Sequence, residues 1–549
     1  MTPQRTSIAE WAFGPGPPGR FWPRWLWLRT LGLIFFSAFY SYAFQVRGLI
    51  GPDGILPVAG YLEEVRRALG SQRFWYTPSL LWINSGSHAL EALWIAGLIA
   101  SVALVLNLWP RASIAVCLIA YLSIVTVGQD FSEYQSDGML LAAGFLSFFT
   151  APPALQPGLG RRDPPSRASI FMLQWLWLTI YFESGVVKLA SHDPEWRHLT
   201  ALDQYYQNGP LPNWMGWYAQ QLPHGILAAL CLGTLTIELG LIWLMFFPRP
   251  FRLVLFFVVT FFQLGIILTA NLAFLNHLVL ALGIFLLDDR FILALFRRLR
   301  ARFGVESRVE SGGSPTPPAA PADKAPQPGS PQLPPAFPPR SWTALRHRAA
   351  IVFSAVILIW IFYATFVQLL MLWVSQPPLP IDPVAALEPF RIANRYGLFA
   401  TMTAARYEIE FQGSNDGQNW VAYPFRYKPQ RLDERPRIYA PYQPRFDWNL
   451  WFASLGTWRE YPWVVRTEML LLQNDPAVIT LFGGNPFAKA APRQVRAVEW
   501  QYRFTDLKTK RATGEWWRRE FRGLYAPVLE LGPNGKVIAT QMPAQQAQQ

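Results

Sequence analysis

Cysteine and charge are both scarce in this 549-residue chain. Its two cysteines, Cys117 and Cys231, lie within long apolar stretches, so we expect the water-exposed part of the protein to fold without an internal disulfide. Charged residues make up 15% of the chain, whereas hydrophobic residues make up 52%. This balance is too apolar for an ordinary water-soluble enzyme and indicates an integral membrane protein.

Sequence motifs of the common enzyme classes are missing as well. The chain contains no nucleophile elbow, zincin motif, phosphate-binding P-loop or dinucleotide fingerprint. We therefore predict no lipase active site and no cofactor. The net charge of +13 is better explained by membrane orientation than by nucleic-acid binding, so no nucleic-acid partner is predicted.

Apolar stretches that could cross a bilayer are abundant. A helix needs about 20 residues to span the hydrocarbon core. We predict nine spans, of which the fourth and eighth are short enough for tilt or a re-entrant path to change the count. They cover approximately residues 25–46, 79–108, 112–128, 135–150, 169–190, 225–247, 251–270, 272–287 and 350–374. No small-residue cleavage site ends the first stretch, so we expect it to stay as an anchor.

Lys and Arg residues are distributed unevenly among the short connections. They gather before residue 25 and in 151–168 and 288–349, and they are sparse in the alternate connections. Because cytoplasmic loops carry this excess, we predict a cytoplasmic N-terminus and a C-terminal domain in the periplasm or lumen. The composition is rich in Ala, Arg, Pro and Trp, which favours a bacterial inner membrane, with the endoplasmic reticulum membrane as the eukaryotic equivalent.

Composition divides the chain into six segments. Residues 311–339 are rich in Pro, Ala, Gly and Ser with few aliphatic side chains, which predicts a disordered tether. The segments are an inner N-terminal segment 1–24, a multi-span membrane domain 25–290, a Pro-rich inner disordered linker 291–349, a last transmembrane helix 350–374, a β-rich periplasmic or lumenal domain 375–536 and a disordered tail 537–549.

The predicted β-rich domain begins with a hairpin. Residues 406–412 and 421–427 alternate like strands, and Asn415, Asp416 and Gly417 supply turn chemistry between them. Further along, we predict helices over 447–455 and 463–472 and strands over 495–504 and 515–521. The expected fold is therefore a polytopic α-helical membrane domain followed by a β-rich, sandwich-like domain with short helices.

Six ionisable side chains fall within the predicted spans, where an unpaired charge is costly. They are His88, Glu91, Glu183, Lys188, Glu238 and His277. Lys188 and the two histidines would lie near the outer ends of their spans, whereas Glu183 and Glu238 lie deeper and need partners. We interpret these groups as lining a polar cavity open to the outer face. Local pairing and packing of the same groups is the alternative.

The predicted outer loop 191–224 combines metal-capable and aromatic side chains. The first kind comprises His192, Asp193, Glu195, His198 and Asp203. Their spacing matches no standard zinc motif, so we predict no metal site. The aromatic side chains include Trp196, Tyr205, Tyr206 and Trp214. They are typical of an interfacial belt, and a contact surface for an apolar client is the alternative.

Three groups of motifs resemble the lipase maturation factor family. The first is FSEYQSD at 131–137 with LLAAGF at 140–145, and the second is GVVK at 185–188, WRHLT at 196–200 and PLPN at 210–213. The third is NRYG at 394–397, PYQPR at 441–445, DW at 447–448, WFA at 451–453, NPF at 485–487 and EWW at 515–517. Ala142 stands where the resemblance implies a carboxylate, so a function tied to that carboxylate is not expected here.

This resemblance implies a protein that helps lipases reach an active folded state. The implied partner is an exported lipase or another secreted client protein, and membrane lipid is a second expected partner. On this basis the candidate client-binding residues are Trp196, Tyr205, Tyr206, Trp214, Asp447, Trp448, Trp451, Asn485, Pro486, Phe487, Trp516 and Trp517.

A shorter stretch, YFESGVVKL at 181–189, is also similar to vitamin K-dependent γ-carboxylases and their bacterial relatives. That family uses a lysine at the position matching Lys188. The similarity implies an alternative function as a membrane enzyme with Lys188 as base and His88, Glu91 and His277 as further catalytic candidates. A third alternative is a membrane scaffold with a binding β-sandwich. Of the three, the sequence favours the maturation factor over the enzyme and the scaffold.

Overall fold

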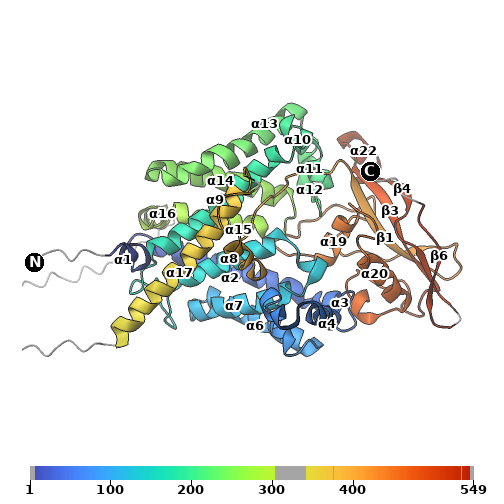
Figure 1. Ribbon diagram of the computed structural model, residues 1–549. Helices are drawn as coiled ribbons and strands as arrows, with labels where there is room; N and C mark the ends of the chain where they lie inside the picture. Colours follow the sequence, from blue (N-terminus) through green and yellow to red (C-terminus); the bar gives the residue numbers. More distant parts are fainter. Residues whose placement is uncertain (1–6, 303–341, 375, 533, 545–549) are drawn as a thin grey trace, which may run out of the picture.

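The computed structural model describes residues 7–302, 342–374, 376–532 and 534–544. A bundle of helices forms one end of the molecule, and the C-terminal sheet domain forms the other (Figure 1). The short helix α1 (Ile8–Phe13) lies at the end of the bundle remote from the sheet. Described residues from the segments rich in Lys and Arg contact one another near that remote end: Arg24 donates to the carbonyls of Leu159 and Gly160, and Asp289 accepts hydrogen bonds from the backbone of Phe21 and Trp22.

Every predicted span contains helix. The helices are α2 (Phe21–Ala43), α6 (Ser87–Val105), α7 (Pro110–Val125), α8 (Gln135–Thr150), α9 (Arg167–Ala190), α13 (His224–Leu235), α14 (Arg249–Thr269), α15 (Leu275–Leu282) and α17 (Trp342–Leu370). A π-turn η4 (Thr236–Gly240) and a 3₁₀ segment η5 (Leu241–Phe246) continue α13, and η6 (Gly283–Leu286) continues α15. Within the described residues, five helices are long and apolar enough to cross a membrane: Ser87–Val105, Arg167–Ala190, His224–Phe246, Arg249–Thr269 and Leu345–Leu370. The predicted count of nine spans is therefore not confirmed.

The second predicted span, 79–108, begins too early. Residues 80–82 form the 3₁₀ turn η2 (Leu80–Trp82), and α6 starts only after Gly86. His88 consequently lies in the first turn of the helix with its side chain 99% exposed. The apolar run 80–83 predicts helix, but hydrophobicity alone does not reveal where a helix starts.

The predicted disordered linker, 291–349, is too long at both ends. Helix α16 (Asp289–Arg302) covers its start, and α17 begins at Trp342. Arg300 and Arg302 lie in the last turn of α16, where positive charge interacts favourably with the helix dipole. Residues 303–341 lie outside the described residues.

Small helices fill the connections on the side of the sheet domain. Between α2 and α6 are α3 (Val46–Ile50), α4 (Val58–Leu69) and α5 (Arg73–Tyr76); the loop after α9 contains α10 (Pro194–Arg197), α11 (Leu202–Asn208) and α12 (Trp214–Ala219). Helix α18 (Asp382–Ala385) follows α17 and packs against it.

The C-terminal domain is built on one six-stranded antiparallel sheet. Its strands are β1 (Arg406–Ser414), β2 (Val421–Ala422), β3 (Gln494–Phe504), β4 (Trp517–Leu524), β5 (Val528–Leu531) and β6 (Val537–Gln541). The order is β2-β1-β3-β5-β6, with β4 pairing β3. The helices are α19 (Arg445–Ala453), α20 (Trp463–Leu472), α21 (Pro476–Ile479) and α22 (Leu507–Thr513). Both larger helices are present within two residues of their expected bounds, and the predicted hairpin is present, although its second strand, expected over 421–427, is limited to Val421–Ala422.

Two details of this domain differ from expectation. The described strands form a single sheet, so the predicted sandwich is wrong: α19 packs on β1, and α20 packs on β3 and β5, where a second sheet was expected. The predicted disordered tail 537–549 is also partly wrong, because Val537–Gln541 form β6 and pair with β5. A short edge strand rich in small and polar residues gives too weak an alternation to be recognised from sequence.

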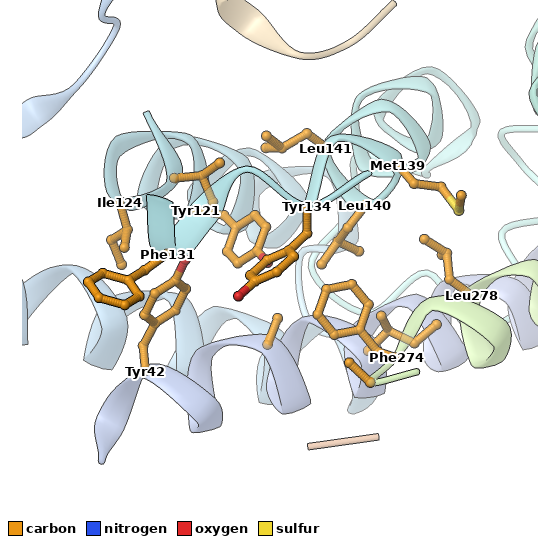
Figure 2. Close-up of a cluster of buried hydrophobic side chains, with 14 of the residues drawn as sticks. Tyr42, Tyr121, Ile124, Phe131, Tyr134, Met139, Leu140, Leu141, Phe274 and Leu278 are labelled. Carbon is orange, nitrogen blue, oxygen red and sulfur yellow. The ribbon is translucent and has the colours of Figure 1, made fainter. Parts of the chain in front are cut away.

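The two domains share one hydrophobic core. A single cluster of buried apolar side chains runs from Trp27 of α2 to Leu529 of β5. Figure 2 shows part of its membrane-domain side, where the side chains of Tyr42, Tyr121 and Tyr134 converge from different segments. Because burial of apolar surface is the main stabilising term in folding, this continuity fixes the sheet domain on the bundle.

Candidate functional site at the junction of the two domains

A buried ion pair lies at the centre of the junction. Asp137, in the first turn of α8, and Arg445, the first residue of α19, are both fully buried. The Arg445 guanidinium donates through Nη1 to Asp137 Oδ2 at 2.8 Å and through Nη2 to Asp137 Oδ1 at 2.9 Å. Two parallel bonds of this kind fix both distance and orientation. The pair therefore positions α19 against α8.

The surroundings of this pair complete its hydrogen bonding. Tyr121 donates its hydroxyl to Asp137 Oδ1 at 2.6 Å, and Arg445 Nη1 also donates to the carbonyl of Phe131 at 2.8 Å. The Arg445 guanidinium carbon lies 4.2 Å from the centre of the Tyr42 ring. These contacts offset part of the desolvation penalty that a buried ion pair carries.

A second buried arginine anchors the sheet to the loop after α9. Arg406 of β1 donates to the carbonyls of Gln207, at 3.1 Å, and Pro210, at 3.1 Å, and also bonds Gly209. Its charge is balanced by Glu408, which in turn pairs with Lys428 at 2.6 Å. Burial lowers the pKa of Arg406, and Glu408 opposes that shift.

Two more polar contacts cross the junction. The backbone N–H of Tyr396 donates to Glu183 of α9 at 2.6 Å. Asn271, in the loop before α15, donates to the carbonyl of Arg437 at 2.8 Å and accepts from the N–H of Tyr439 at 2.7 Å. Both contacts bind irregular backbone of the C-terminal domain, which would otherwise leave buried polar groups unsatisfied.

A cavity of about 530 Å³ opens beside this junction, among α9, α13, η4, α14 and α15. Lys188 and Glu238 face each other in it, with Nζ 2.9 Å from Oε2. The Lys188 ammonium also donates to the carbonyl of Leu398 at 3.0 Å and that of Ser184 at 3.3 Å. Its neighbours therefore occupy all three of its N–H groups.

The polar cavity predicted from sequence is only partly present. Lys188 and Glu238 line it together with Asn276, but His88, Glu91 and His277 do not. Glu91 instead forms an ion pair with Arg47, and Glu183 faces the C-terminal domain. Tyr181 and Gln263 belong to the cavity and were not predicted. A glutamine in an otherwise apolar span is a usable sequence signal, whereas a tyrosine among so many aromatics is not.

An open groove of about 940 Å³ lies on the outer surface of the junction. The membrane domain contributes Tyr40, Phe44, Arg47 and Trp94, and the C-terminal domain contributes Arg426, Tyr427, Tyr439, Tyr442 and Asp447. Burial raises the pKa of the Asp447 carboxyl to about 7, although nearby Lys428 and the backbone N–H groups of Tyr427 and Lys428 lower it. The groove thus combines exposed aromatics, arginine and two carboxyl groups, those of Glu91 and Asp447.

Most candidate client-binding residues lie inside the molecule. Seven of them are buried: Trp196, Tyr206, Asp447, Trp448, Phe487, Trp516 and Trp517. Pro486 is exposed, and Tyr205, Trp214, Trp451 and Asn485 are half-buried. The Trp448 ring packs on Tyr134, and that of Trp516 packs on Trp217, both across the junction. Trp448 and Trp516 therefore serve interdomain packing, and of the seven only Asp447 also lines the open groove.

Four of the five metal-capable side chains of the loop after α9 have other partners, and the fifth, His198, is exposed. Asp193 caps α10 and accepts from the N–H of Met402, while Asp203 accepts from His224 at 2.9 Å. His192 contacts Arg197 at 2.6 Å, and Glu195 bonds Thr200. Among the described residues, no group of three or more His, Cys, Asp or Glu side chains is placed to hold a metal ion.

These features define a class of protein: a polytopic helical membrane protein with a sheet domain docked on its bundle through buried ion pairs. Two family models match the chain. The lipase maturation factor transmembrane domain matches residues 22–294, and the lipase maturation factor C-terminal domain matches residues 392–527. The domain division seen in the structure is the same.

Similar proteins agree with these models. Lipase maturation factor 1 of Bos taurus is 29% identical over 532 residues, covering 93% of this chain and 90% of its own. Lipase maturation factor 2 of Homo sapiens is 30% identical over 598 residues, covering 93% and 83%. No solved structure matches the chain. The chain belongs to the lipase maturation factor family.

Proposed function

We propose that this protein helps exported lipases to fold or assemble into their active form, working from the membrane with its C-terminal domain on the side where the client is exported. The observation that carries the proposal is the family relationship over 93% of the chain, to proteins named lipase maturation factors. The N-terminus is then cytoplasmic, in a bacterial inner membrane or, in a eukaryote, the endoplasmic reticulum membrane. The basic end of the bundle lies opposite the sheet domain, in support of this sidedness.

The groove at the junction is the proposed client contact. Phe44 is 59% exposed there, and its ring lies 5.0 Å from that of Tyr40. Exposed aromatics and arginine in a concave surface are typical of protein-binding hot spots. Because the junction is held by buried ion pairs, the groove keeps its shape without a client bound. The exposed Pro486 and the half-buried Trp451 and Asn485 remain further candidate contacts.

The direct test is recovery of active lipase from cells that produce both proteins. Tyr40→Ala with Phe44→Ala should lower the specific activity of the secreted lipase by about tenfold or more, as for removal of hot-spot aromatics. The total amount of lipase synthesised should not change. Phe247 and Phe251 form a matched control, since they are an exposed aromatic pair with the same separation in sequence, have ring centres 5.8 Å apart and lie outside the groove.

Unchanged specific activity in the groove variant would reject the groove as the contact. Unchanged activity on deletion of the whole protein would reject the maturation role and favour a scaffold that binds other molecules. The enzyme alternative has less support, since the ammonium of Lys188 is held by Glu238 and two carbonyls in a structural arrangement. A base needs a free lone pair directed at a substrate.

A further inference from the structure

The cavity around Lys188 opens sideways, between two helices that are candidate membrane spans. Leu230 of α13 is 45% exposed and Phe261 of α14 is 72% exposed, and both line the cavity. Helix α14 packs mainly on η5, η6, α12 and α15 rather than on α13. The two helices therefore leave a gap between them. The mouth therefore faces the hydrocarbon of the bilayer, from which an occupant could enter.

The inner end of the cavity is polar and carries unsatisfied groups. Ser184 Oγ and Asn276 Oδ1 are buried and have no hydrogen-bond partner among the described residues. Asn276 donates to Gln263 at 2.7 Å, and Gln263 donates to the hydroxyl of Tyr181 at 2.7 Å. That chain of bonds leaves the Tyr181 hydroxyl proton without an acceptor in the described part of the structure. Unpaired buried polar groups are costly, which indicates a missing partner.

The charges of the cavity balance each other. Lys188 and Glu238 form a close pair, so a charged headgroup would find no countercharge and would lose its hydration without compensation. A hydroxyl group, in contrast, can donate to Asn276 Oδ1 and accept from the hydroxyl of Ser184 or Tyr181, and a carbonyl group can accept from those two hydroxyls. The remainder of the lining is apolar, with side chains such as Ile237, Phe262 and Ile266.

We propose that this cavity binds an uncharged, single-chain amphiphile whose hydroxyl or carbonyl head reaches Ser184, Tyr181 and Asn276, as in a monoacylglycerol. A volume of about 530 Å³ is within the range of small-ligand pockets. The apolar chain leaves through the mouth between α13 and α14. A phospholipid, with a charged head and two chains, fits neither the charge balance nor the volume. This site is independent of the proposed client groove.

Two glycines allow the cavity to be filled without disturbing the fold. A Cβ atom added at Gly233 of α13 or at Gly265 of α14 meets no protein atom within 4 Å, and both residues line the cavity. Gly225 is also on α13 and equally open, but it does not line the cavity. Leucine is a better helix former than glycine, so none of the three substitutions should disturb its helix.

The experiment uses the purified full chain in detergent with a photoactivatable analogue of monooleoylglycerol, followed by identification of the labelled peptides. Labelling should occur in α13 and α14. The Gly233→Leu variant should show about tenfold less labelling, which corresponds to an affinity about tenfold weaker. Gly225→Leu should be labelled like the wild type. Thermal melting of each variant checks that it is folded.

Competition identifies the head chemistry. Excess monooleoylglycerol should abolish labelling, whereas oleic acid and lysophosphatidylcholine at the same concentration should not. Competition by oleyl alcohol would support the proposal and show that one hydroxyl is sufficient. Equal labelling of all variants, or equal competition by the charged lipids, would overturn it. Because the readout is lipid labelling, the outcome does not depend on whether the protein matures lipases.

Discussion

Asp137 of the membrane domain and Arg445 of the C-terminal domain form a fully buried bidentate ion pair although they are 308 residues apart in the sequence. Each residue belongs to a motif that resembles the lipase maturation factor family, and each lies at the start of its helix. The contact joins the two family domains at one point, so that the orientation of the sheet domain depends on it.

Removing one partner of this pair should be strongly destabilising. Arg445→Met or Asp137→Leu leaves one buried charge without compensation, which costs about 3–5 kcal/mol. The double variant replaces both charges by apolar groups, and its stability should return close to that of the wild type. Thermal unfolding of the purified protein, with limited proteolysis to detect release of the C-terminal domain, measures both effects.

An exposed ion pair provides the control for this cycle. Arg431 pairs with Asp433 at 2.6 Å, but the two side chains are 74% and 57% exposed. Exposed ion pairs are screened by water and contribute little to stability, so Arg431→Met should hardly change the melting temperature. If Arg445→Met were equally mild, the ion pair would not be what holds the domains together.

Glu468 should make stability depend on pH. This residue of α20 is fully buried, and burial raises its pKa well above the usual range, with partial opposition from the backbone of Ala497. The folded protein therefore keeps the proton while the unfolded chain releases it above pH 4.5. As pH rises from there through neutrality, this carboxyl lowers the unfolding free energy by up to about 1.4 kcal/mol per pH unit.

The variant Glu468→Gln keeps the shape of the side chain and cannot ionise. Its unfolding free energy should fall less steeply with pH than that of the wild type between about pH 5 and 8. Glu520→Gln makes the same change at an exposed side chain of β4 and serves as the control. Parallel pH profiles for wild type and Glu468→Gln would show that Glu468 is not protonated in the folded state.

Lys188 and Glu238 should behave as a structural pair. Lys188→Met leaves Glu238 buried without its cation and should lower stability by about 3–5 kcal/mol. Adding Glu238→Met should restore most of the lost stability, because no buried charge is then left unpaired. Lipase maturation should follow the amount of folded protein in both variants. A folded double variant that has lost all maturation activity would instead point to a chemical role for the lysine.

Local structure could be predicted from the sequence because its signals are local. The helix over 463–472 was predicted with the bounds that α20 has, and the hairpin of β1 and β2 followed from alternation around a turn at 415–417. The start of α6 was predicted wrongly, since an apolar run extends beyond the helix. The number of spans could not be settled, because short helices such as α7 and α15 are apolar without being span-length.

The site could not be predicted in the same way, because it is made of distant residues. Nothing near Arg445 indicates that its partner is Asp137, and a tryptophan such as Trp448 or Trp516 suits a buried junction as well as a client surface. The family motifs therefore suggested a client surface for residues of which seven are buried in the structure. Polar atoms without local partners, such as those of Asn271 and Gln263, are the better guide to long-range contacts.

The proposed sidedness can be tested with introduced cysteines, because both native thiols are buried and should not react. Glu520→Cys places a thiol on the exposed face of β4, and Arg161→Cys places one at the basic end of the bundle. A membrane-impermeant maleimide applied to intact cells or spheroplasts should label the Glu520→Cys variant. It should label the Arg161→Cys variant only after the membrane is permeabilised. The reverse pattern would put the groove in the cytosol, away from any exported client, and would refute the maturation role proposed for this chain.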